Sequence, residues 1–559
     1  MADHLTDARP ARLKPETEAM ADHLLEVRDL SVRFHTAQGI VNAVNGISWH
    51  LDRGETLAIL GESGSGKSVS ASAIMNLIDT PPGEITGGQI LFDGMDLLRA
   101  SAEERRRLNG KRIAMIFQDP LSHLNPVYPV GWQIAETAMA HGRGKDEARE
   151  RALALMERVG IPNAGASMSK YPHQFSGGQR QRLMIAMALV LKPEILIADE
   201  PTTALDVTVQ AEVLSLLEEL KSETGMGLLM ITHDLGVVAE AADRAVVMEG
   251  GRIVEAGTPH ELYHHARHPY TRKLLAAAPG KGEMRSAERR AQPILSVRDL
   301  RKTYGAFVAL QGVGFDLHAG ETLAVVGESG SGKSTIARLV LRLEEATSGT
   351  VGWKGEELLT KSPREMAKVR RQLQMVFQDP TQSLNPHMSV FQIISEGWAI
   401  HRDILPKSRW QARVAELLEQ VGLEPSHALR APHQFSGGQR QRIAIARALA
   451  LEPEVIICDE AVSALDVSIQ KQVVDLLGAL RDRLGIAFIF IAHDLPLVRD
   501  FADRVLVMQG GEIVEQGTVR QIFDAPREPY TERLLFAGLD ADPDVQAERR
   551  RTRLALEPA

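Results

Sequence analysis

Two octapeptides of identical sequence, one beginning at Gly61 and the other at Gly327, have the residue types of a phosphate-binding loop. Each follows the pattern G-x-x-x-x-G-K-[ST], comes after an apolar run and precedes a helical pattern, as the motif requires. Glycines allow a tight turn whose N–H groups point at phosphate oxygens, and the next helix adds its positive N-terminal end. The lysine can reach the β- and γ-phosphates of a nucleotide, and the last serine can bind Mg²⁺. The two loops consist of Gly61, Glu62, Ser63, Gly64, Ser65, Gly66, Lys67 and Ser68, and of Gly327, Glu328, Ser329, Gly330, Ser331, Gly332, Lys333 and Ser334.

Two pairs of acids have the placement that phosphoryl transfer to water needs. Asp199 and Asp459 end apolar, strand-like runs, where an α/β sheet presents its ligands, and each can hold Mg²⁺. Glu200 and Glu460 follow directly, so they point the other way and are candidates to polarise the attacking water. The alternative is that these acids end a strand and have no catalytic role. The phosphate loop upstream of each acid pair makes this alternative less favoured.

Histidine and glutamine also stand at predicted strand ends in both halves. His233 and His493 follow the aspartates of their own halves at the same separation in sequence, and each can hydrogen-bond the γ-phosphate and orient the water. Gln118 and Gln378 lie in a repeated Phe-Gln-Asp-Pro and are candidates to sense the metal or the water. The alternative for the histidines is a place at the edge of the core with ordinary hydrogen-bond partners. The alternative for the glutamines is a polar turn without a functional role.

A second phosphate-seeking surface is predicted in each half. Phe-Ser-Gly-Gly-Gln-Arg-Gln-Arg occurs at 175–182 and again at 435–442, with its glycines at a helix start. Because each half already has a phosphate loop, this surface suits a nucleotide bound by the other half. The residues concerned are Ser176, Gly177, Gly178 and Gln179, and Ser436, Gly437, Gly438 and Gln439.

Aromatic residues upstream of each lysine are candidates to stack on a nucleotide base. Phe34 precedes Lys67, and Tyr304 precedes Lys333 at a slightly shorter separation. Ordinary packing is the alternative, more so for Phe34 than for Tyr304. Thr335 follows the second loop where the first half has Val69, so the first site lacks one potential hydrogen bond to the α-phosphate.

The helices and strands predicted around these residues indicate a parallel α/β fold that occurs twice in the chain. Continuous apolar strands are predicted at 113–117, 194–198 and 227–232, and they alternate with helices, which indicates a sheet covered on both faces. A half-exposed strand is expected at 25–32 and a strand pair at 39–51. Helices are predicted at 102–108, 132–159, 176–191 and 207–220.

The spacing of the motifs defines a tandem repeat. The offset between the halves is constant from Gln118 and Gln378 onward, and it is smaller there than at the two lysines, so one fold recurs with a short net deletion. We expect a disordered leader at 1–22, a first domain at 23–265, an extension and linker at 266–292, a second domain at 293–525, and a second extension with a polar tail at 526–559. The arginines of that tail are expected to be solvated, and Met20 is an alternative start because the segment 20–24 repeats the segment 1–5.

Composition excludes several classes of protein. The 559 residues carry a formal net charge of −9, so nucleic acid is not the expected partner. A single cysteine excludes a disulfide framework and a cysteine metal cluster within one chain. No apolar run approaches the length of a membrane span, and the segment 1–22 does not read as a signal peptide.

Taken in order, these motifs resemble those of ABC-transporter ATPase domains. The set includes Ala204-Leu205-Asp206 and Ala464-Leu465-Asp466, and it recurs twice over nearly the whole chain. The resemblance implies two P-loop domains in tandem, each with a mainly parallel core, an antiparallel β subdomain and a helical subdomain. It implies ATP and Mg²⁺ as cofactors, and head-to-tail pairing of the halves, with each ATP between one half's loop and the other's Ser-Gly-Gly-Gln.

Two further segments narrow the resemblance. Residues 268–275 and 528–535 are similar to the C-terminal extension of the oligopeptide, dipeptide and nickel importer ATPases, and the chain looks like two such ATPases fused, as in peptide, microcin C and glutathione uptake. This implies two multi-spanning permease subunits, indirectly a periplasmic substrate-binding protein, and a peripheral location at the cytoplasmic face of the inner membrane. The sequence leaves the cargo open among peptide, glutathione, nickel, opine and sugar, and also whether the two sites are equally active.

Two other classes compete with a peptide importer. A soluble tandem ATPase acting on ribosomes usually has a long, charged, helical linker, whereas the join here is short, at 266–292. A DNA-repair ATPase of this type carries zinc-binding cysteines, which this chain lacks.

Overall fold

A computed structural model of the chain describes residues 23–36, 39–202, 205–285, 292–463 and 465–556. The expected leader at 1–22, and Ala204 and Ala464 of the repeated motif, lie outside these residues. Within the described residues, no helix combines the length and the apolar character needed to cross a membrane.

The first half contains two sheets. Its strands are β1 (Leu25–Thr36), β2 (Gly39–Leu51), β3 (Thr56–Leu60), β4 (Gly83–Phe92), β5 (Met95–Asp96), β6 (Ile113–Ile116), β7 (Ile195–Asp199), β8 (Gly227–Thr232), β9 (Arg244–Glu249) and β10 (Arg252–Gly257). An antiparallel sheet has the order β2-β1-β4-β5, and a six-stranded sheet has the order β10-β9-β3-β8-β7-β6. The second sheet is parallel from β9 to β6, and only its edge strand β10 is antiparallel. Every residue of β3, β7 and β8 is buried, which explains why these strands are apolar along nearly their whole length.

Helices of the first half cover the sheets and build a separate helical part. They are α1 (Lys67–Met75), α2 (Ala102–Leu108), α3 (Pro120–His123), α4 (Val130–Ala140), α5 (Lys145–Arg158), α6 (Ala164–Ser167), α7 (Gly177–Leu189), α8 (Val207–Thr224), α9 (Leu235–Ala241), α10 (Pro259–His264) and α11 (Pro269–Ala277). Buried residues of α4, α5, α7 and α8 share one apolar core, which fixes the start of α7 relative to the parallel sheet.

The second half repeats this order. Its strands are β11 (Leu295–Tyr304), β12 (Phe307–Leu317), β13 (Thr322–Gly327), β14 (Ser348–Trp353), β15 (Glu356–Glu357), β16 (Leu373–Val376), β17 (Val455–Asp459), β18 (Ala487–Ile491), β19 (Arg504–Gln509) and β20 (Glu512–Thr518). Its helices are α12 (Lys333–Val340), α13 (Pro363–Gln372), α14 (Pro380–Ser383), α15 (Val390–Ile400), α16 (Trp410–Gln420), α17 (Gly437–Leu449), α18 (Val467–Leu484), α19 (Leu495–Phe501), α20 (Val519–Asp524), α21 (Pro529–Ala537) and α22 (Pro543–Leu556). The sheets have the orders β12-β11-β14-β15 and β16-β17-β18-β13-β19-β20, so the predicted tandem α/β fold is confirmed.

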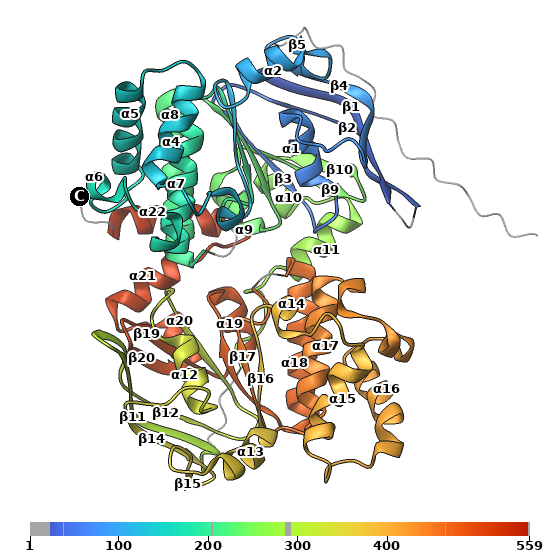
Figure 1. Cartoon of the computed structure of the whole chain (residues 1–559), viewed down its shortest axis with the longest axis vertical. Coiled ribbons are helices and arrows are strands. Elements are labelled where there is room, and N and C mark those ends of the chain that lie inside the picture. The colour runs from blue at the N-terminus through green and yellow to red at the C-terminus, as the bar shows by residue number, and fades with distance from the viewer. Residues whose placement is uncertain (1–22, 37–38, 203–204, 286–291, 464, 557–559) are drawn as a thin grey trace, which may run out of the picture.

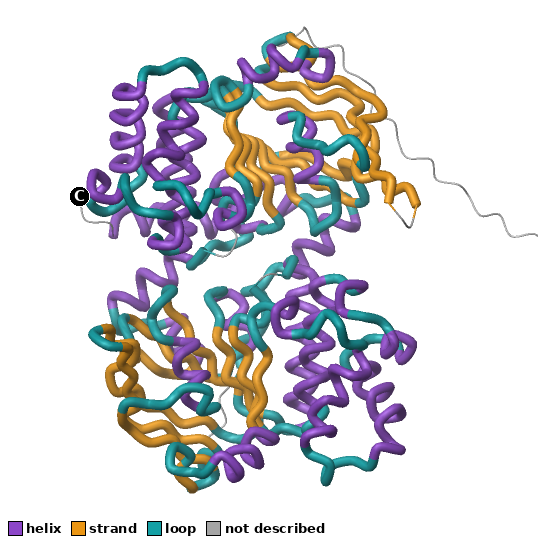
Figure 2. The backbone as a smooth tube through the Cα atoms, viewed as in Figure 1, coloured by secondary structure: helices purple, strands orange, loops and turns teal. Residues whose placement is uncertain are grey.

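The two halves pack against each other in opposite orientations (Figures 1 and 2). The helical part of the first half stands above the strands of the second, and the strands of the first stand above the helical part of the second. At the junction α11 of the first half contacts α18 of the second, and α21 of the second contacts α8 of the first. The helix that follows each half therefore packs on the core of its own half and also contacts the opposite half.

The end of the chain differs from the expectation of a solvated polar tail. Helix α22 lies against α9 and α10 of the first half, on the far side of the junction from the half that precedes it (Figure 1). Arg553 is buried and binds the carboxylate of Glu240, which also accepts from Gln546 at 2.5 Å. The prediction was wrong for Arg553, because a buried acceptor on the other half provides a partner that the sequence of the tail does not reveal, whereas Arg551 is exposed as expected.

Several predicted boundaries also move. The expected strand pair at 39–51 is the single strand β2, and α8 runs to Thr224 rather than ending at Leu220. The segment 266–292, expected to be an extension and linker, contains α11, of which Tyr270, Leu274 and Leu275 are buried. Tertiary packing extends these elements beyond what local patterns indicate.

Candidate active sites

The first phosphate loop connects β3 to α1 and can only be built with glycine at two positions. A Cβ on Gly61 would lie 2.4 Å from the carbonyl oxygen of Met248, and one on Gly66 would lie 2.3 Å from that of Ala43. Gly66 also has a φ of 100°, in the left-handed region that favours glycine. These close approaches hold the loop at the end of the parallel sheet, directly before the N-terminus of α1.

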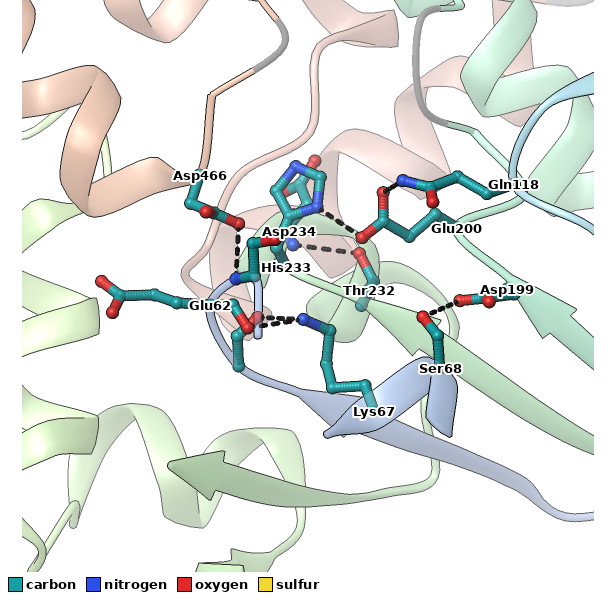
Figure 3. A network of polar contacts seen from close by, with 12 residues as sticks. Glu62, Lys67, Ser68, Gln118, Asp199, Glu200, Thr232, His233, Asp234 and Asp466 are labelled. Atoms are coloured by element: carbon teal, nitrogen blue, oxygen red, sulfur yellow. Dashed lines mark hydrogen bonds and ion pairs between the residues drawn. The ribbon is translucent and has the colours of Figure 1, made fainter. Parts of the chain in front are cut away.

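Lys67, Ser68 and Asp199 form the inner part of the site (Figure 3). The ammonium of Lys67 donates to the carbonyl oxygens of Gly61 at 2.6 Å and Glu62 at 2.9 Å. The hydroxyl of Ser68 donates to the Asp199 carboxylate at 3.0 Å. Burial lowers the pKa of Lys67 and raises the pKa of Asp199 to about 6. The site thus offers a buried cation beside a hydroxyl–carboxylate pair.

Glu200 stands next to Asp199 but faces a different set of partners. The amide of Gln118 donates to its carboxylate at 2.7 Å, and Nδ1 of His233 lies 3.2 Å from its other oxygen (Figure 3). Burial would lower the pKa of His233, but the hydrogen bond and the charge of Glu200 raise it above its ordinary value. Glu200 has a φ of 48°, which is strained for a residue with a Cβ and turns its side chain away from that of Asp199.

The second half repeats these contacts. Lys333 donates to the carbonyl oxygens of Gly327 at 2.8 Å and Glu328 at 2.9 Å. Ser334 donates to Asp459 at 2.8 Å, and Gln378 donates to Glu460 at 2.8 Å. Each sequence-predicted group of loop lysine, loop serine, acid pair and glutamine is therefore brought together, once in each half.

The histidine differs between the two sites. Nδ1 of His493 lies 3.7 Å from Glu460, which is longer than the distance between His233 and Glu200 in the first site. Burial of Glu460 would raise its pKa, but the proximity and charge of His493 and the charge of Lys333 together lower it. Burial would likewise lower the pKa of His493, and Glu460 raises it.

The two sites also contact the opposite half. The backbone N–H of Ser63 in the first loop donates to the carboxylate of Asp466 at 2.9 Å (Figure 3). Asp206 is the counterpart of Asp466. Although burial lowers the pKa of Lys333, the charge of Asp206 is the strongest single influence that opposes the shift. The sequence contains both aspartates in a repeated motif, but their contacts become visible only when the halves are packed together.

Two tyrosines that sequence reasoning did not assign to the site also contact the loops. The hydroxyl of Tyr270, on α11, accepts from the backbone N–H of Glu62 at 3.1 Å. The hydroxyl of Tyr530, on α21, accepts from that of Glu328 at 3.2 Å. Each extension is therefore attached to the phosphate loop of its own half, and the shared Pro-Tyr-Thr of the two extensions is the sequence signal for these contacts.

The Ser-Gly-Gly-Gln segments begin α7 and α17. Ser176 and Gln179 cap the helix reciprocally, as do Ser436 and Gln439. Ser176 and Ser436 are exposed. Within the part of the chain that the structure describes, no hydrogen bond joins these four-residue segments to the phosphate loop of the opposite half.

The aromatic candidates lie in different environments. Phe34 is partly buried and packs against the core of the antiparallel sheet. Tyr304 is 44% exposed, its hydroxyl donates to Glu344, and the ammonium of Lys302 lies 4.7 Å from its ring centroid. Packing thus accounts for Phe34, whereas the ring of Tyr304 remains accessible from solvent.

The donors present fit nucleotide phosphates and Mg²⁺. The hydroxyls of Ser65 and Ser331 are buried within the loops and have no hydrogen-bond partner among the described residues. Buried hydroxyls rarely stay unpaired, so a phosphate oxygen would complete each loop. The hydroxyl and carboxylate oxygens of each Ser–Asp pair are ligands that Mg²⁺ prefers.

Comparison with known proteins agrees with this geometry. A family model described as ABC transporter matches residues 44–203 and 310–463, and one described as oligopeptide/dipeptide transporter, C-terminal region, matches 254–302 and 514–557. The glutathione import ATP-binding protein GsiA of Escherichia coli O157:H7 is 46% identical over 575 residues, which cover 95% of this chain and 92% of GsiA. The same values hold for GsiA of Shigella dysenteriae serotype 1 (strain Sd197). The solved structure of cbiO1 from Clostridium perfringens, part of the ABC transporter complex cbiONQ, covers 48% of this chain and 100% of its own, with 29% identity and a TM-score of 0.40.

Proposed function

Because the chain belongs to the ABC transporter family and is the ATPase subunit of an importer of the oligopeptide/glutathione type, we propose that it energises the uptake of peptides through separate membrane subunits. The observation that carries the proposal is the attachment of each importer-type extension to a phosphate loop, through Tyr270 in the first half and Tyr530 in the second. Neither the family nor the relatives support an action on ribosomes.

In the proposed mechanism the phosphate loops bind ATP, the aspartates bind the metal ion and the glutamates activate the attacking water. Lys67 and the loop N–H groups hold the phosphates in the first half, and Ser68 and Asp199 are the proposed Mg²⁺ ligands, with Gln118 as a further one. Bound Mg²⁺ neutralises charge on the β- and γ-phosphates. Glu200 accepts the proton of the attacking water, and His233 holds the glutamate in place from 3.2 Å.

The same assignment applies to the second half. Lys333 binds the phosphates, Ser334, Asp459 and Gln378 are the proposed Mg²⁺ ligands, Thr335 assists at the α-phosphate, and Tyr304 stacks on the base. Glu460 is the proposed proton acceptor, held by His493. We propose that both sites hydrolyse ATP and that they differ in affinity.

Each nucleotide is proposed to lie between the halves. The contact between Asp466 and Ser63 supports this, since it brings the second half against the first phosphate loop. In the closed state Ser436 to Gln439 would complete the first site, and Ser176 to Gln179 the second. Hydrolysis would release this pairing and reopen the halves.

The membrane subunits are proposed to dock beside Gln118 and Gln378. Next to Gln378 a hollow of about 310 Å³ is lined mainly by apolar side chains, among them Phe377, Leu343 and Ile400, which are 41%, 51% and 72% exposed, together with the charged residues Arg370, Glu396 and Arg447. An apolar hollow adjacent to a residue that contacts Glu460 suits transmission of the state of the site to a partner. We place the chain at the cytoplasmic face of the inner membrane, with two permease subunits and, indirectly, a periplasmic binding protein.

Peptides are the proposed cargo, with glutathione, itself a small peptide, as the first compound to test. The relatives are named for glutathione import, and the extension family is named for oligopeptides and dipeptides. Nickel, opines and sugars are the competing cargoes.

The decisive experiment is capture of the tagged chain from its own cells, followed by reconstitution of the complex in vesicles. Two multi-spanning proteins and ATP-dependent uptake of labelled glutathione or dipeptides would support the proposal. Ribosomal proteins without membrane partners would overturn the transport assignment. Transport of nickel alone would overturn only the cargo.

A further inference from the structure

Two histidines and an aspartate converge where the end of the chain lies against the first half. His260 and His264 stand one turn apart on α10, and Asp544 is in the first turn of α22. Nε2 of His264 lies 3.1 Å from one carboxylate oxygen of Asp544, and Nε2 of His260 lies 3.9 Å from the same oxygen. The three ligand atoms lie within 4.8 Å of one another. The cluster therefore joins two segments that are far apart in the sequence.

We propose that His260, His264 and Asp544 form a binding site for a divalent transition metal ion, with Zn²⁺ as the best fit. Zn²⁺ binds imidazole nitrogen and carboxylate oxygen at about 2.0–2.2 Å, which places tetrahedral ligand atoms about 3.3–3.6 Å apart. The two separations from Asp544, 3.1 Å to His264 and 3.9 Å to His260, need shifts of only a few tenths of an ångström to reach that range. Histidines at positions i and i+4 share one helix face, so α10 presents both rings to the same ion. Three protein ligands leave a fourth position for water.

The surroundings of the cluster favour a cation. The ligand side chains are 57%, 32% and 69% exposed for His260, His264 and Asp544, so an ion can enter from solvent. Asp540 and Asp542 lie in the same acidic segment as Asp544. The guanidinium of Arg549 lies 3.1 Å from Asp540, which leaves the charge of Asp544 for the histidines and an ion.

A second cluster of two histidines and an aspartate shows which kind of neighbour argues against metal binding. His23, His50 and Asp52 also bring three ligand atoms within reach of one another. There, however, the guanidinium of Arg244 lies 2.9 Å from Nε2 of His50, so that nitrogen already has a partner and a positive charge occupies the position. This cluster provides an internal control for a metal titration.

The proposed ion would join two parts of the chain that sequence does not connect. Helix α10 belongs to the first half, whereas α22 follows the extension of the second half and packs on α9 and α10. Because the three ligands meet only when α22 is docked, metal binding would stabilise the docked arrangement. None of the three ligands belongs to the phosphate loops or to the acid pairs of the candidate active sites.

Zn²⁺ binding by the full-length chain tests the proposal. The protein should carry a tag without histidine, and excess Mg²⁺ should be present to occupy the carboxylates of the ATP sites. In competition with a chromophoric chelator, wild type should bind one equivalent of Zn²⁺, and His264→Gln and Asp544→Asn should each weaken binding at least tenfold. His50→Gln should bind as wild type. Absent binding by wild type, or unchanged binding by both variants, would overturn the site.

Hydrogen exchange tests the bridge itself. Zn²⁺ should slow amide exchange in residues 543–556 of wild type and of His50→Gln, and it should have no effect in His264→Gln. If Zn²⁺ binds but exchange in α22 does not change, the ion does not join the two segments and the bridge is overturned.

Discussion

The carboxylate of Asp466 accepts a hydrogen bond at 2.9 Å from the backbone N–H of Ser63, although the two residues belong to different halves of the chain. Ser63 lies in the first phosphate loop, and Asp466 directly precedes α18 in the second half. One half of the chain therefore holds the phosphate loop of the other, and the state of one half can influence the site of its neighbour.

Replacing Asp466 tests this contact. Asp466→Ala removes the acceptor, and because the contact is exposed to water we expect a loss of about 1 kcal/mol, or about fivefold in ATP affinity at the first site. Isothermal titration in an Asp459→Asn background, which weakens the second site, would isolate the effect. Asp475→Ala, an exposed change on α18 beside Lys471, is the matched control. Equal affinity in the two variants would show that the contact does not support the loop.

Replacing either proposed proton acceptor tests the chemistry. Glu200→Gln and Glu460→Gln keep the size and polarity of the side chain but cannot accept a proton, so each should lower turnover of its site by about 10²-fold or more. Steady-state phosphate release measures this, and ATP binding should persist. A variant with unchanged turnover would identify its site as non-catalytic.

Removing the tyrosine hydroxyls tests the attachment of the extensions. Tyr270→Phe and Tyr530→Phe each take one acceptor from a loop N–H, and a lost hydrogen bond of about 1 kcal/mol predicts about fivefold weaker ATP binding. Tyr128→Phe is the control, since Tyr128 stacks on Trp132 away from the loops. Unchanged affinity in both extension variants would mean that water replaces the hydroxyl at no cost.

Proton competition at Asp199 predicts a pH dependence of metal binding. Burial raises the pKa of this carboxyl from 3.8 to about 6, so the folded state holds the proton more tightly than the unfolded state. Its contribution to stability is therefore largest below pH 3.8 and declines as the pH rises through about 6, whereas metal binding requires the ionised form. Mn²⁺ affinity of the first site, measured in an Asp459→Asn background, should fall about tenfold per pH unit below pH 6. A flat profile between pH 5 and 7 would contradict this account.

The buried pair under α22 predicts a local loss of stability. The side chain of Glu240 is 3% exposed and binds Arg553, so Glu240→Ala leaves a buried guanidinium without its carboxylate. We expect α22 to lose about 3 kcal/mol of protection against exchange. Glu223→Ala, which breaks an exposed pair with Arg158, should cost less than about 1 kcal/mol. Equal protection in the two variants would mean that α22 docks without this pair.

Local motifs allowed much of each site to be predicted. The loop residues, the acid pairs and the glutamines are each fixed to the end of a strand or the start of a helix, and the parallel order of strands brings those ends together. Because the motifs recur in the second half, the same prediction applies to both sites. The predicted contacts of Lys67, Ser68 and Asp199 follow from that regular geometry.

Contacts between distant segments could not be predicted in this way. Tyr270 and Asp466 reach the same loop from different halves, and α22 was expected to be a solvated tail. The surfaces through which the two halves contact each other depend on the shape and the buried charges of both halves together. Local sequence patterns do not predict such long-range contacts.

The two phosphate-binding loops, their acids and the tandem α/β fold could be predicted from the sequence, because they follow from short-range patterns of residue type. In contrast, the folded chain was needed to show that Asp466 contacts the first loop, that the extension tyrosines contact the loops, and that α22 packs on the first half. Those relationships depend on long-range packing, in which a buried partner such as Glu240 determines where Arg553 lies.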